Sequence, residues 1–504
     1  MIKLIYRIES DYMSKKRMLI VTSVTLSVVT ISLGIVKLYQ TYALSNYIGT
    51  VTDTGIDVYI NDDSYASIPA NGSSNVYYML TNTNPGTVKY GVAYQTTSGV
   101  TVKVYDTSED PATGTIEEND KKYIKLHLEN KNSTNKTIEL STVLGYENGG
   151  DLVVPSGVTL VTDTYTPPPT AAEYITKLYT TASKTTVTNN SITYNTAPSV
   201  SLMNDRLGGT TTDLDGGNIR YYGASPNNYI YFNCSDYSNQ TSSTCETWRI
   251  IGVFDGKLKL IRGSQIGTYS WDNKDTSTGA ESNFGKNDWT TARLMKLLNP
   301  SDYYTTDSND NNLGQGLYYN SASGKCYSGQ NNATVDCNFT STGIKNDITR
   351  NMIAETTYNL GGWNSNTVYP NLMYEKERGT TVYTGRPTTP WTGKIALAYT
   401  SDYGYAADLN QCKQTLANYD NSTCTSNNWM KAIITNNGSN SGWLLTPYCS
   451  TSSNVWYVYP VGNVYFNYTV YSAFGAVPVL SLSSELGIES GGDGSSSNPY
   501  KLSA

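Results

Sequence analysis

The side chains that most often perform chemistry are scarce in this sequence. The chain has 504 residues and a single histidine, His127, which lies in the alternating run KKYIKLHLEN. A zinc site built from several histidines is therefore excluded. A nucleophilic triad needs only one histidine, but no nucleophile motif accompanies this one, and no glycine-rich phosphate loop or nucleophile elbow is present. We predict no catalytic residue, no metal, no cofactor and no enzymatic activity.

The seven cysteines point to structural chemistry. Six of them form local pairs at separations of 11, 11 and 12 positions, namely Cys234 with Cys245, Cys326 with Cys337, and Cys412 with Cys424. In an exported domain this spacing favours three short-range disulfides, although other connectivities are possible. A metal site is the alternative, but CxxC pairs are absent and only one histidine exists. The seventh, Cys449, has no obvious base or cation nearby that would make it a catalytic thiolate.

Two carboxylate clusters are candidates for binding calcium through oxygen ligands. Asp213 lies close to Asp215, and Asp307 lies close to Asp310. Neither run fits the calcium loop of an EF-hand, and Asp, Asn and Gly also favour turns for local reasons. We therefore interpret both as turns. An extracellular hydrolase with two carboxylates is still an alternative, because a sequence does not show which carboxylates are close in space.

The stretch from Trp443 to Leu482 is the clearest candidate for positioning a binding surface. If it is extended, successive side chains point to opposite faces, and the even-numbered Val458, Val464 and Val470 would face a core. The odd positions that would face solvent are Tyr457, Tyr459, Tyr465, Asn467 and Tyr471. A surface rich in Tyr, Ser and Asn has the composition of an antibody-like paratope. The alternative is that these aromatic residues simply pack on a sheet, where aromatics are favoured.

The overall composition is typical of a β-rich extracellular protein. Charged residues make up only 15% of the chain, which contains 44 Tyr, 42 Gly and 6 Phe. The net charge is −7 and the pI is near 5.0. Nucleic acid is excluded as a partner, because no basic surface for phosphates is evident.

The N-terminus has the pattern of a membrane signal anchor. Lys15-Lys16-Arg17 precedes an uncharged run of 19 residues, Met18 to Val36, which is long enough to span a bilayer as a helix. The basic cluster would stay in the cytoplasm and place the bulk of the chain outside the cell membrane, as a single-pass protein. The alternative is a cleaved signal peptide, with a small-residue site at Thr41-Tyr42-Ala43, and a secreted protein.

The chain after residue 44 divides into two predicted domains joined by a linker. Residues 45–163 contain short alternating runs at Asn75–Leu80, Thr87–Tyr94, Tyr123–Leu128 and Thr137–Leu144, which indicate an immunoglobulin-like β-sandwich spacer. Residues 164–170 form a Pro-rich linker. Thr170 and Glu173 then have capping-box spacing and predict a helix at the start of the last domain, residues 171–504. The predicted fold class is mainly β with some helix (α+β).

Short motifs in this last domain resemble a known group of proteins. They include Ser401-Asp402-Tyr403-Gly404-Tyr405-Ala406, Asn428-Trp429, Trp443-Leu444-Leu445-Thr446-Pro447, Gly462-Asn463-Val464, Pro478-Val479-Leu480 and Gly491-Gly492-Asp493-Gly494. The domain is similar to that of exported gut-bacterial proteins with a C-terminal C-type-lectin-like fold, some of which resemble the target proteins of diversity-generating retroelements. The resemblance covers roughly residues 171–504. It departs at Val477, where the group often carries Arg before the proline of its closing strand.

The resemblance implies a C-type-lectin-like domain with insertions and a hypervariable ligand-binding face at about residues 443–480. In such targets, adenine-directed mutagenesis of Asn-type codons yields Tyr, Ser, Asn, Phe and Cys at surface positions, which would also explain Cys449. The residues expected to bind ligand are Tyr448, Asn454, Trp456, Tyr457, Tyr459, Tyr465, Phe466, Asn467, Tyr468, Tyr471, Ser472 and Phe474.

The implied function is that of a cell-surface protein that binds an extracellular protein or glycan. A carbohydrate-binding adhesin, in which Trp456 and the tyrosines stack on sugar rings, is the second hypothesis. The extracellular hydrolase is the third. The N-terminal helix would attach the protein to the membrane, and a cleaved signal peptide would release it.

Overall fold

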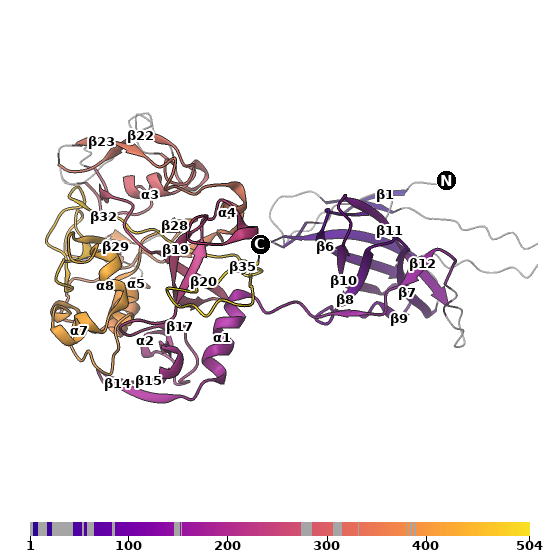
Figure 1. The fold of residues 1–504 in the computed structure, drawn as a ribbon, viewed down its shortest axis with the longest axis horizontal. Helices are drawn as coiled ribbons and strands as arrows, with labels where there is room; N and C mark the ends of the chain where they lie inside the picture. The colour runs from indigo at the N-terminus through magenta and orange to yellow at the C-terminus, as the bar shows by residue number, and fades with distance from the viewer. Residues whose placement is uncertain are drawn as a thin grey trace, which may run out of the picture. The chain divides into compact units, whose positions relative to one another are not determined.

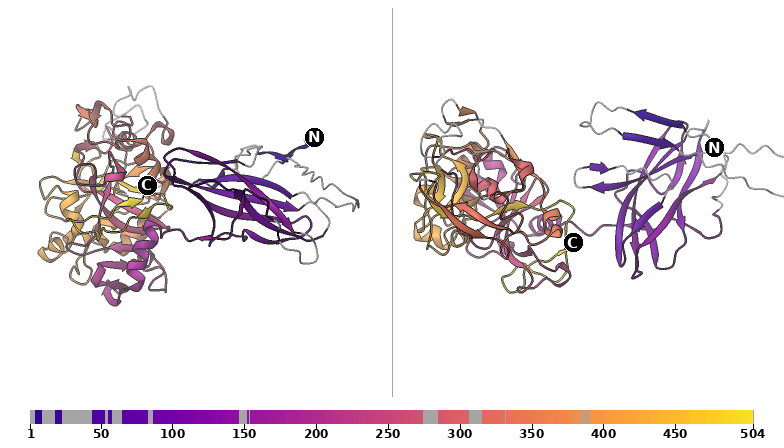
Figure 2. Two further views of the ribbon diagram at one scale, coloured as in Figure 1. Left: turned by 45° about the vertical axis from the view of Figure 1, so that its right-hand side comes forward. Right: turned by 90° about the horizontal axis from the view of Figure 1, so that it is seen from above.

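The structure is a computed structural model that divides the chain into two compact units, Met1–Pro168 and Pro169–Ala504 (Figures 1 and 2). It describes residues 4–8, 18–22, 44–52, 55–57, 65–82, 86–145, 152, 154–273, 285–305, 315–330, 332–379, 381–383, 386–387 and 390–503. The division between the units falls inside the proline run of residues 167–169. Each unit is described below by itself.

Most of the predicted membrane-spanning run lies outside the described residues. Its first five residues form strand β2 (Met18–Thr22), paired with β1 (Leu4–Ile8), where a helix was predicted. Ile20, Val21 and Thr22 are β-branched, which favours a strand over a helix. None of the helices in the described part of the chain is long and apolar enough to cross a membrane.

The first unit is built around two sheets in which nearly all strand pairs are antiparallel. One has the order β13 (Thr164–Tyr165), β8 (Val100–Tyr105), β10 (Lys121–Asn130), β6 (Gly72–Asn82), β3 (Leu44–Thr52) and β4 (Gly55–Asp57). The other has the order β12 (Val158–Leu160), β7 (Val88–Gln95), β11 (Lys136–Gly145) and β5 (Tyr65–Ile68), with β9 (Thr113–Ile116) paired to β7. The four alternating runs predicted here fall in β6, β7, β10 and β11.

One hydrophobic core joins the two sheets of this unit. Tyr78 and Leu126 come from one sheet, Tyr90 and Leu140 come from the other, and all four are fully buried. His127 points away from this core but is also buried, because its ring stacks on Tyr165 with 3.6 Å between the ring centroids. Burial lowers the pKa of His127, although Glu129 nearby acts in the opposite direction.

The second unit is built around a nine-stranded sheet. Its order is β14 (Thr185–Asn189), β15 (Ile192–Ala197), β16 (Leu202–Asn204), β17 (Ile219–Tyr221), β19 (Glu246–Phe254), β20 (Lys257–Arg262), β33 (Val479–Ser481) and β28 (Ile395–Ala396), with β18 (Tyr229–Phe232) also paired to β19. A five-stranded sheet has the order β21 (Thr268–Ser270), β32 (Ala473–Gly475), β29 (Gly442–Pro447), β30 (Val455–Val458) and β31 (Val464–Tyr465). Strands β32 and β33, near the end of the chain, thus pair with β21 and β20 from the first part of the unit.

Short strands and helices complete this unit. The two-stranded pairs are β22 (Ser323–Tyr327) with β23 (Thr334–Asn338), β24 (Thr356–Tyr358) with β27 (Trp391–Gly393), β25 (Thr381–Tyr383) with β26 (Arg386–Pro387), and β34 (Gly487–Ile488) with β35 (Leu502–Ser503). The helices are α1 (Ala171–Thr181), α2 (Arg206–Gly209), α3 (Arg293–Leu298), α4 (Asp347–Met352), α5 (Pro370–Glu377), α6 (Thr400–Tyr405), α7 (Ser422–Ser426) and α8 (Trp429–Ile434). The predicted capping box is present at α1, where Thr170 and Glu173 bond each other's backbone amides. Strands predominate, so the mainly β fold class is confirmed at this level.

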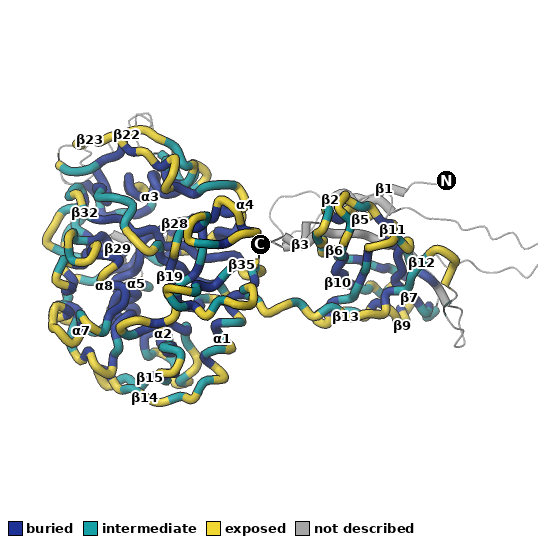
Figure 3. The backbone as a smooth tube through the Cα atoms, in the orientation of Figure 1, coloured by how far each residue is buried: buried dark blue, intermediate teal, exposed yellow. Residues whose placement is uncertain are grey.

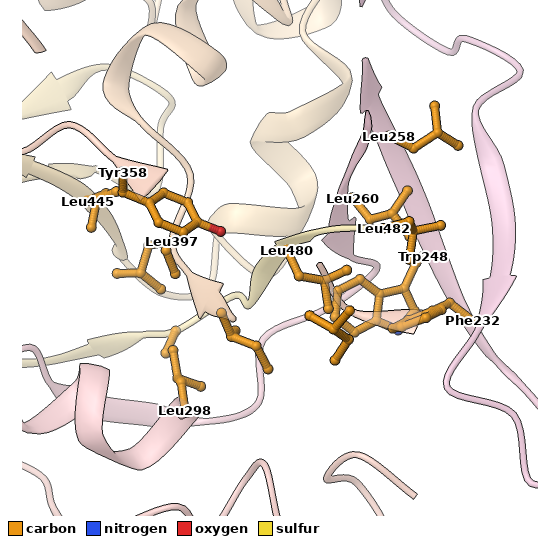
Figure 4. Close-up of a cluster of buried hydrophobic side chains, with 14 of the residues drawn as sticks. Phe232, Trp248, Leu258, Leu260, Leu298, Tyr358, Leu397, Leu445, Leu480 and Leu482 are labelled. Carbon is orange, nitrogen blue, oxygen red and sulfur yellow. The ribbon is translucent and has the colours of Figure 1, made fainter. Parts of the chain in front are cut away.

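Both faces of the central strands in the second unit are buried. Leu260 packs in one core and its neighbour Ile261 in a second, because successive side chains of a strand point to opposite faces. Leu480 and Val479 divide between the same two cores in the same way. Figure 4 shows Leu260 and Leu480 close to Trp248 in the first core. In Figure 3 the buried backbone accordingly runs through the interior of the unit, and exposed residues gather in the connecting loops.

Three disulfides tie loops of the second unit. They join Cys234 to Cys245, Cys326 to Cys337 and Cys412 to Cys424, which are the pairings that the spacing favoured. Disulfides form and persist in oxidising compartments. They therefore indicate an extracellular or secreted protein.

A buried ionic network connects β17, β20 and α6. Arg220 donates to Asp205 at 2.6 Å and to Asp402 at 2.8 Å, and Lys259 donates to the other oxygen of Asp402. Arg220, Asp205 and Asp402 are at most 2% exposed. Burial alone would raise the pKa of Asp402, but Lys259 and Arg220 lower it to about 2.

Replacing Asp402 with Asn should lower the free energy of unfolding by about 3–5 kcal/mol at pH 7, because it leaves two buried cations without their shared carboxylate. The carboxylate has a lower pKa in the folded chain than its usual 3.8, so its contribution is full above about pH 4 and is lost as the pH falls toward 2. Urea denaturation of the parent and the Asp402→Asn variant between pH 7 and pH 2 measures this. The stability difference should shrink in acid, and a difference that stays constant down to pH 2 would contradict the ionic role.

Candidate ligand-binding face

The stretch from Trp443 to Leu482 folds back on itself and is not one continuous strand. It supplies β29, β30, β31, β32 and β33, and β30 pairs with β29 on one side and β31 on the other. Residues 459–463 form the tight turn between β30 and β31, closed by bonds from Gly462 N to Tyr459 O at 2.8 Å and from Tyr459 N to Asn463 O at 2.9 Å. Residues that are close in this stretch of sequence therefore differ in how far their side chains are buried.

Val458, Val464 and Val470 form part of the scaffold, as the sequence predicted. Val458, Val464 and Val470 are fully buried, and so is Val455. Val458 and Val464 pair directly across β30 and β31 and pack in the second core. The valine positions are thus fixed by packing on other parts of the unit.

Two of the predicted ligand-binding residues lie inside the protein, which corrects the prediction. Trp456 is 0% exposed and Tyr457 is 1% exposed. The prediction treated one face of the strand as solvated, but β30 lies between the two cores, with Trp456 in one and Tyr457 in the other. Trp456 therefore offers no ring face for a sugar, and the odd-numbered Tyr457 is part of the scaffold.

Three further predicted residues are half-buried and cover this scaffold. Tyr448 and Phe466 stack on each other with 4.1 Å between ring centroids, and both contact Trp456 edge-on. Phe474 lies 4.5 Å from Trp443 and 5.0 Å from Tyr457 by ring centroids. These rings form a layer between the core and the surface.

Four predicted residues are exposed and lie around Tyr457. We call Tyr459, Tyr465, Asn467 and Tyr468 the tyrosine patch. Its three tyrosines are 41%, 37% and 46% exposed. The ring centroid of Tyr465 is 5.8 Å from that of Tyr459 and 6.4 Å from that of Tyr457, and Tyr468 lies 5.6 Å from Tyr457.

A hydrogen bond from the hydroxyl of Tyr457 to the side chain of Asn467 connects the patch to the scaffold. Burial raises the pKa of Tyr457, with smaller contributions from the neighbouring tyrosines, so its hydroxyl stays protonated and can donate this bond. The patch is thus a set of exposed rings held on a rigid aromatic base.

The remaining predicted residues lie near the patch with intermediate exposure. They are Asn454, Tyr471 and Ser472. Asn454 donates to Phe466 O at 2.8 Å, which holds the connection after β31 against the one before β30. Its side chain therefore has a structural bond in addition to any contact with a ligand.

Residues that the sequence did not single out hold these loops in place. Asn287 is buried and its side-chain amide donates to the carbonyl oxygens of Tyr448, Thr451 and Asn454 at 2.8–3.1 Å. Asn287 lies more than 160 residues before these three residues in the sequence, so no local pattern predicts the contacts. Val461, at the tip of the turn, is 50% exposed and extends the surface beside Tyr459.

Gly462 is required by the geometry of the turn. Its φ is +115°, which disfavours other residues, and a Cβ there would lie 3.0 Å from Thr425 and 3.1 Å from the carbonyl oxygen of Tyr419. The hydroxyl of Tyr403 also donates to the Gly462 carbonyl oxygen at 2.5 Å. The close packing of Gly462 and the hydrogen bond from Tyr403 therefore hold the turn that carries Tyr459 in place.

The structure describes Asp213, Asp215 and Cys449 among the residues that the sequence analysis considered as metal ligands or as a reactive thiol. Asp213 accepts from the Asp215 amide at 2.9 Å, as expected for a turn, and Asp215 accepts from Tyr179. Asp307 and Asp310 lie outside the described residues. Cys449 takes part in none of the three disulfides. Within the ranges that the structure describes, no group of three or more His, Cys, Asp or Glu could hold a metal ion.

Buried carboxylates with shifted pKa values are engaged in the fold. Burial raises the pKa of Glu377, which accepts from the Ser401 amide at 3.0 Å and from Thr446 at 2.7 Å. Burial also raises the pKa of Asp272 to about 6, and this side chain accepts from the amides of Lys286 and Arg293. These bonds account for the positions of both groups without reference to a substrate.

Comparison with known proteins adds no further assignment. No protein-family model matches the chain, and no match is found among curated proteins.

Truncation of Trp456 should destabilise the protein strongly, whereas truncation of Tyr459 should have little effect on stability. Trp456→Ala should lower the free energy of unfolding by about 3–5 kcal/mol, because it opens a cavity in the second core. Tyr459→Ala should change it by no more than about 0.5 kcal/mol, because that ring is exposed. Chemical denaturation of both variants checks this division, and equal losses of stability would show that the patch and the scaffold are not separate.

Proposed function

We propose that the protein is an exported ligand-binding protein that presents the tyrosine patch to an extracellular protein or glycan, on a scaffold of C-type-lectin-like type. The observation that carries the proposal is the clustering of exposed Tyr459, Tyr465, Asn467 and Tyr468 on a base of buried residues. Tyrosine gives a large contact area at a low cost in conformational entropy, and asparagine adds adaptable hydrogen bonds.

The packing also supports the proposal that the patch varies in sequence. Val458, Val464 and Val470 are fully buried, whereas the three tyrosines of the patch are 37–46% exposed. Substitutions at exposed positions away from such contacts usually change stability by less than about 0.5 kcal/mol. A diversified protein needs this separation, because each variant must fold before it can bind.

The composition of the patch argues for a broad recognition surface and against a site for one small sugar. Tyr459 lies in the turn after β30, Tyr465 at the end of β31 and Tyr468 in the connection after it, and Val461 adds an apolar group in the same turn as Tyr459. Aromatic residues are the side chains most often responsible for affinity at protein interfaces. We therefore favour an extracellular protein as the ligand, with a glycan as the alternative.

Binding should depend on the patch as a unit. The triple variant Tyr459→Ser, Tyr465→Ser and Tyr468→Ser should lose at least about tenfold in affinity for any ligand found by screening the full chain on glycan arrays and on displayed protein libraries. Tyr65→Ser is the matched control, because Tyr65 is also 41% exposed but belongs to the first unit. Surface plasmon resonance measures the affinities. Binding that survives the triple variant unchanged would refute the proposed face.

Diversification makes a separate prediction about DNA. A nearby template repeat should match the coding sequence for residues 443–480 and differ from it at adenines, and a reverse-transcriptase gene should lie close by. Sequencing the locus from many isolates should show substitutions at Tyr459, Tyr465 and Tyr468 but not at Val458 or Val464. If the locus has neither repeat nor reverse transcriptase, the diversification is refuted while the binding face is still testable.

A further inference from the structure

A second potential binding site lies in the same unit and shares no residue with the tyrosine patch. It is a pocket of about 580 Å³ between β18–β20 and α8. Its walls include Tyr229, Arg249 and Trp429, and Asn436 and Asn437 lie at its rim after α8. This volume is within the range of pockets that bind small molecules.

Arg249 is a buried cation in this pocket. It is 6% exposed, and its guanidinium carbon lies 3.7 Å from the ring centroid of Tyr229 and 4.8 Å from that of Trp429. Its Nε donates to Asn228, and its Nη2 donates to Pro226 O at 3.2 Å. Across the described ranges of the chain, no carboxylate forms an ion pair with it within 4.0 Å.

The missing counter-charge distinguishes Arg249 from the other arginine of the pocket. Arg262 forms a two-point pair with Glu246 at 3.0 and 3.1 Å, so these two charges cancel. Arg249 therefore leaves the pocket with one net positive charge. Burying a charge without a partner is unfavourable, and an anion bound there would remove that penalty.

The surroundings of Arg249 restrict how an anion can approach. Tyr229 and Trp429 lie against the guanidinium, so a ligand meets its N–H edge. A guanidinium carries five N–H donors. Nε and one donor of Nη2 form the two bonds described above, and the Tyr229 side chain also hydrogen-bonds the guanidinium. A planar carboxylate matches the donors that are left.

The rim adds groups suited to hydroxyls. Asn436 and Asn437 are exposed and line the pocket. A carboxamide both donates and accepts hydrogen bonds, which fits the hydroxyl groups of a sugar. A simple inorganic anion would leave these groups unused.

We propose that this pocket binds a hydroxylated carboxylate of the size of a sugar acid, with the carboxylate on Arg249 and the hydroxyls on Asn436 and Asn437. The ligand is either a free sugar acid or an acidic residue at the end of a glycan, since both offer the same groups. The site does not depend on the tyrosine patch.

The test is calorimetric titration of the full chain with D-galacturonate, D-galactose, acetate and a digalacturonate, at low ionic strength. D-galacturonate should bind at least about tenfold more tightly than D-galactose, which has a neutral group in place of the carboxylate. Acetate should bind more weakly than D-galacturonate because it cannot reach the two asparagines. Digalacturonate that binds more tightly than the monosaccharide identifies a glycan end as the ligand, and weaker binding identifies the free acid.

Variants locate the site. Arg249→Lys keeps the charge but loses the planar donors, and it should weaken D-galacturonate binding at least about tenfold. Lys431→Gln is the matched control, because Lys431 belongs to the same helix α8 but does not line the pocket, and the variant should bind normally. The double variant Asn436→Gly and Asn437→Gly removes both carboxamides, and glycine tolerates the positive φ of 47° and 55° at these positions. It should also weaken binding, even if Arg249→Lys fails to fold.

Equal binding of D-galactose and D-galacturonate would overturn the proposal, as would no binding of either. Acetate that binds as tightly as D-galacturonate would overturn the assignment to a sugar acid. A double asparagine variant that binds like the parent would also overturn the proposed role of the rim.

Discussion

Burial of both faces of the central strands is the constraint on which the second unit depends. A sheet with one solvated face alternates between core and surface residues, whereas a sheet covered on both sides is apolar throughout. β20, β30 and β33 belong to the second kind, since consecutive residues such as Leu260 and Ile261 enter different cores. Few positions of these three strands are therefore exposed. The tyrosine patch lies instead in the turn after β30, at the end of β31 and in the connection that follows it.

The buried ions show how the two cores are held in register. Asp402 accepts hydrogen bonds from cations on two different strands, Arg220 on β17 and Lys259 on β20, and from the backbone amide of Tyr399. Apolar packing is not directional, and a slip of one residue would exchange the side chains of the two cores. A carboxylate that requires partners at defined positions penalises such a slip. The network thus supplies a specificity of arrangement that hydrophobic contacts alone do not provide.

The sequence predicted features that arise from local rules. The alternating runs of the first unit became strands, the capping box at Thr170 started a helix, and cysteines close in sequence formed the disulfides. Each depends on residues that lie no more than 12 positions apart or on a short alternating run. The burial of Val458 and Val464 was also predictable, because valine rarely occupies the solvated side of an alternating pattern.

The errors have one physical cause, which is tertiary contact. Tyr457 has the same residue type and strand parity as Tyr459, but Tyr457 packs in the first core and Tyr459 lies exposed in the turn after β30. The support that Asn287 gives to the loop of Tyr448 likewise comes from a distant part of the chain. The pattern of residues within Trp443–Leu482 does not indicate these contacts. The predicted set of twelve residues therefore mixed scaffold, intermediate layer and surface.

The two potential binding surfaces differ in the way the fold limits their variation. The tyrosine patch stands on an aromatic base, and its exposed rings can change while Tyr457 and the valines keep their packing. Arg249 is instead built into the fold by Tyr229, Trp429 and Asn228, so a change there would alter the packing of β18, β19 and α8 together. A surface of the first kind suits a partner that changes, and a site of the second kind suits a ligand whose chemistry is constant. The second core connects the two surfaces, because α8 packs in it together with Val458 and Val464 on either side of the turn after β30.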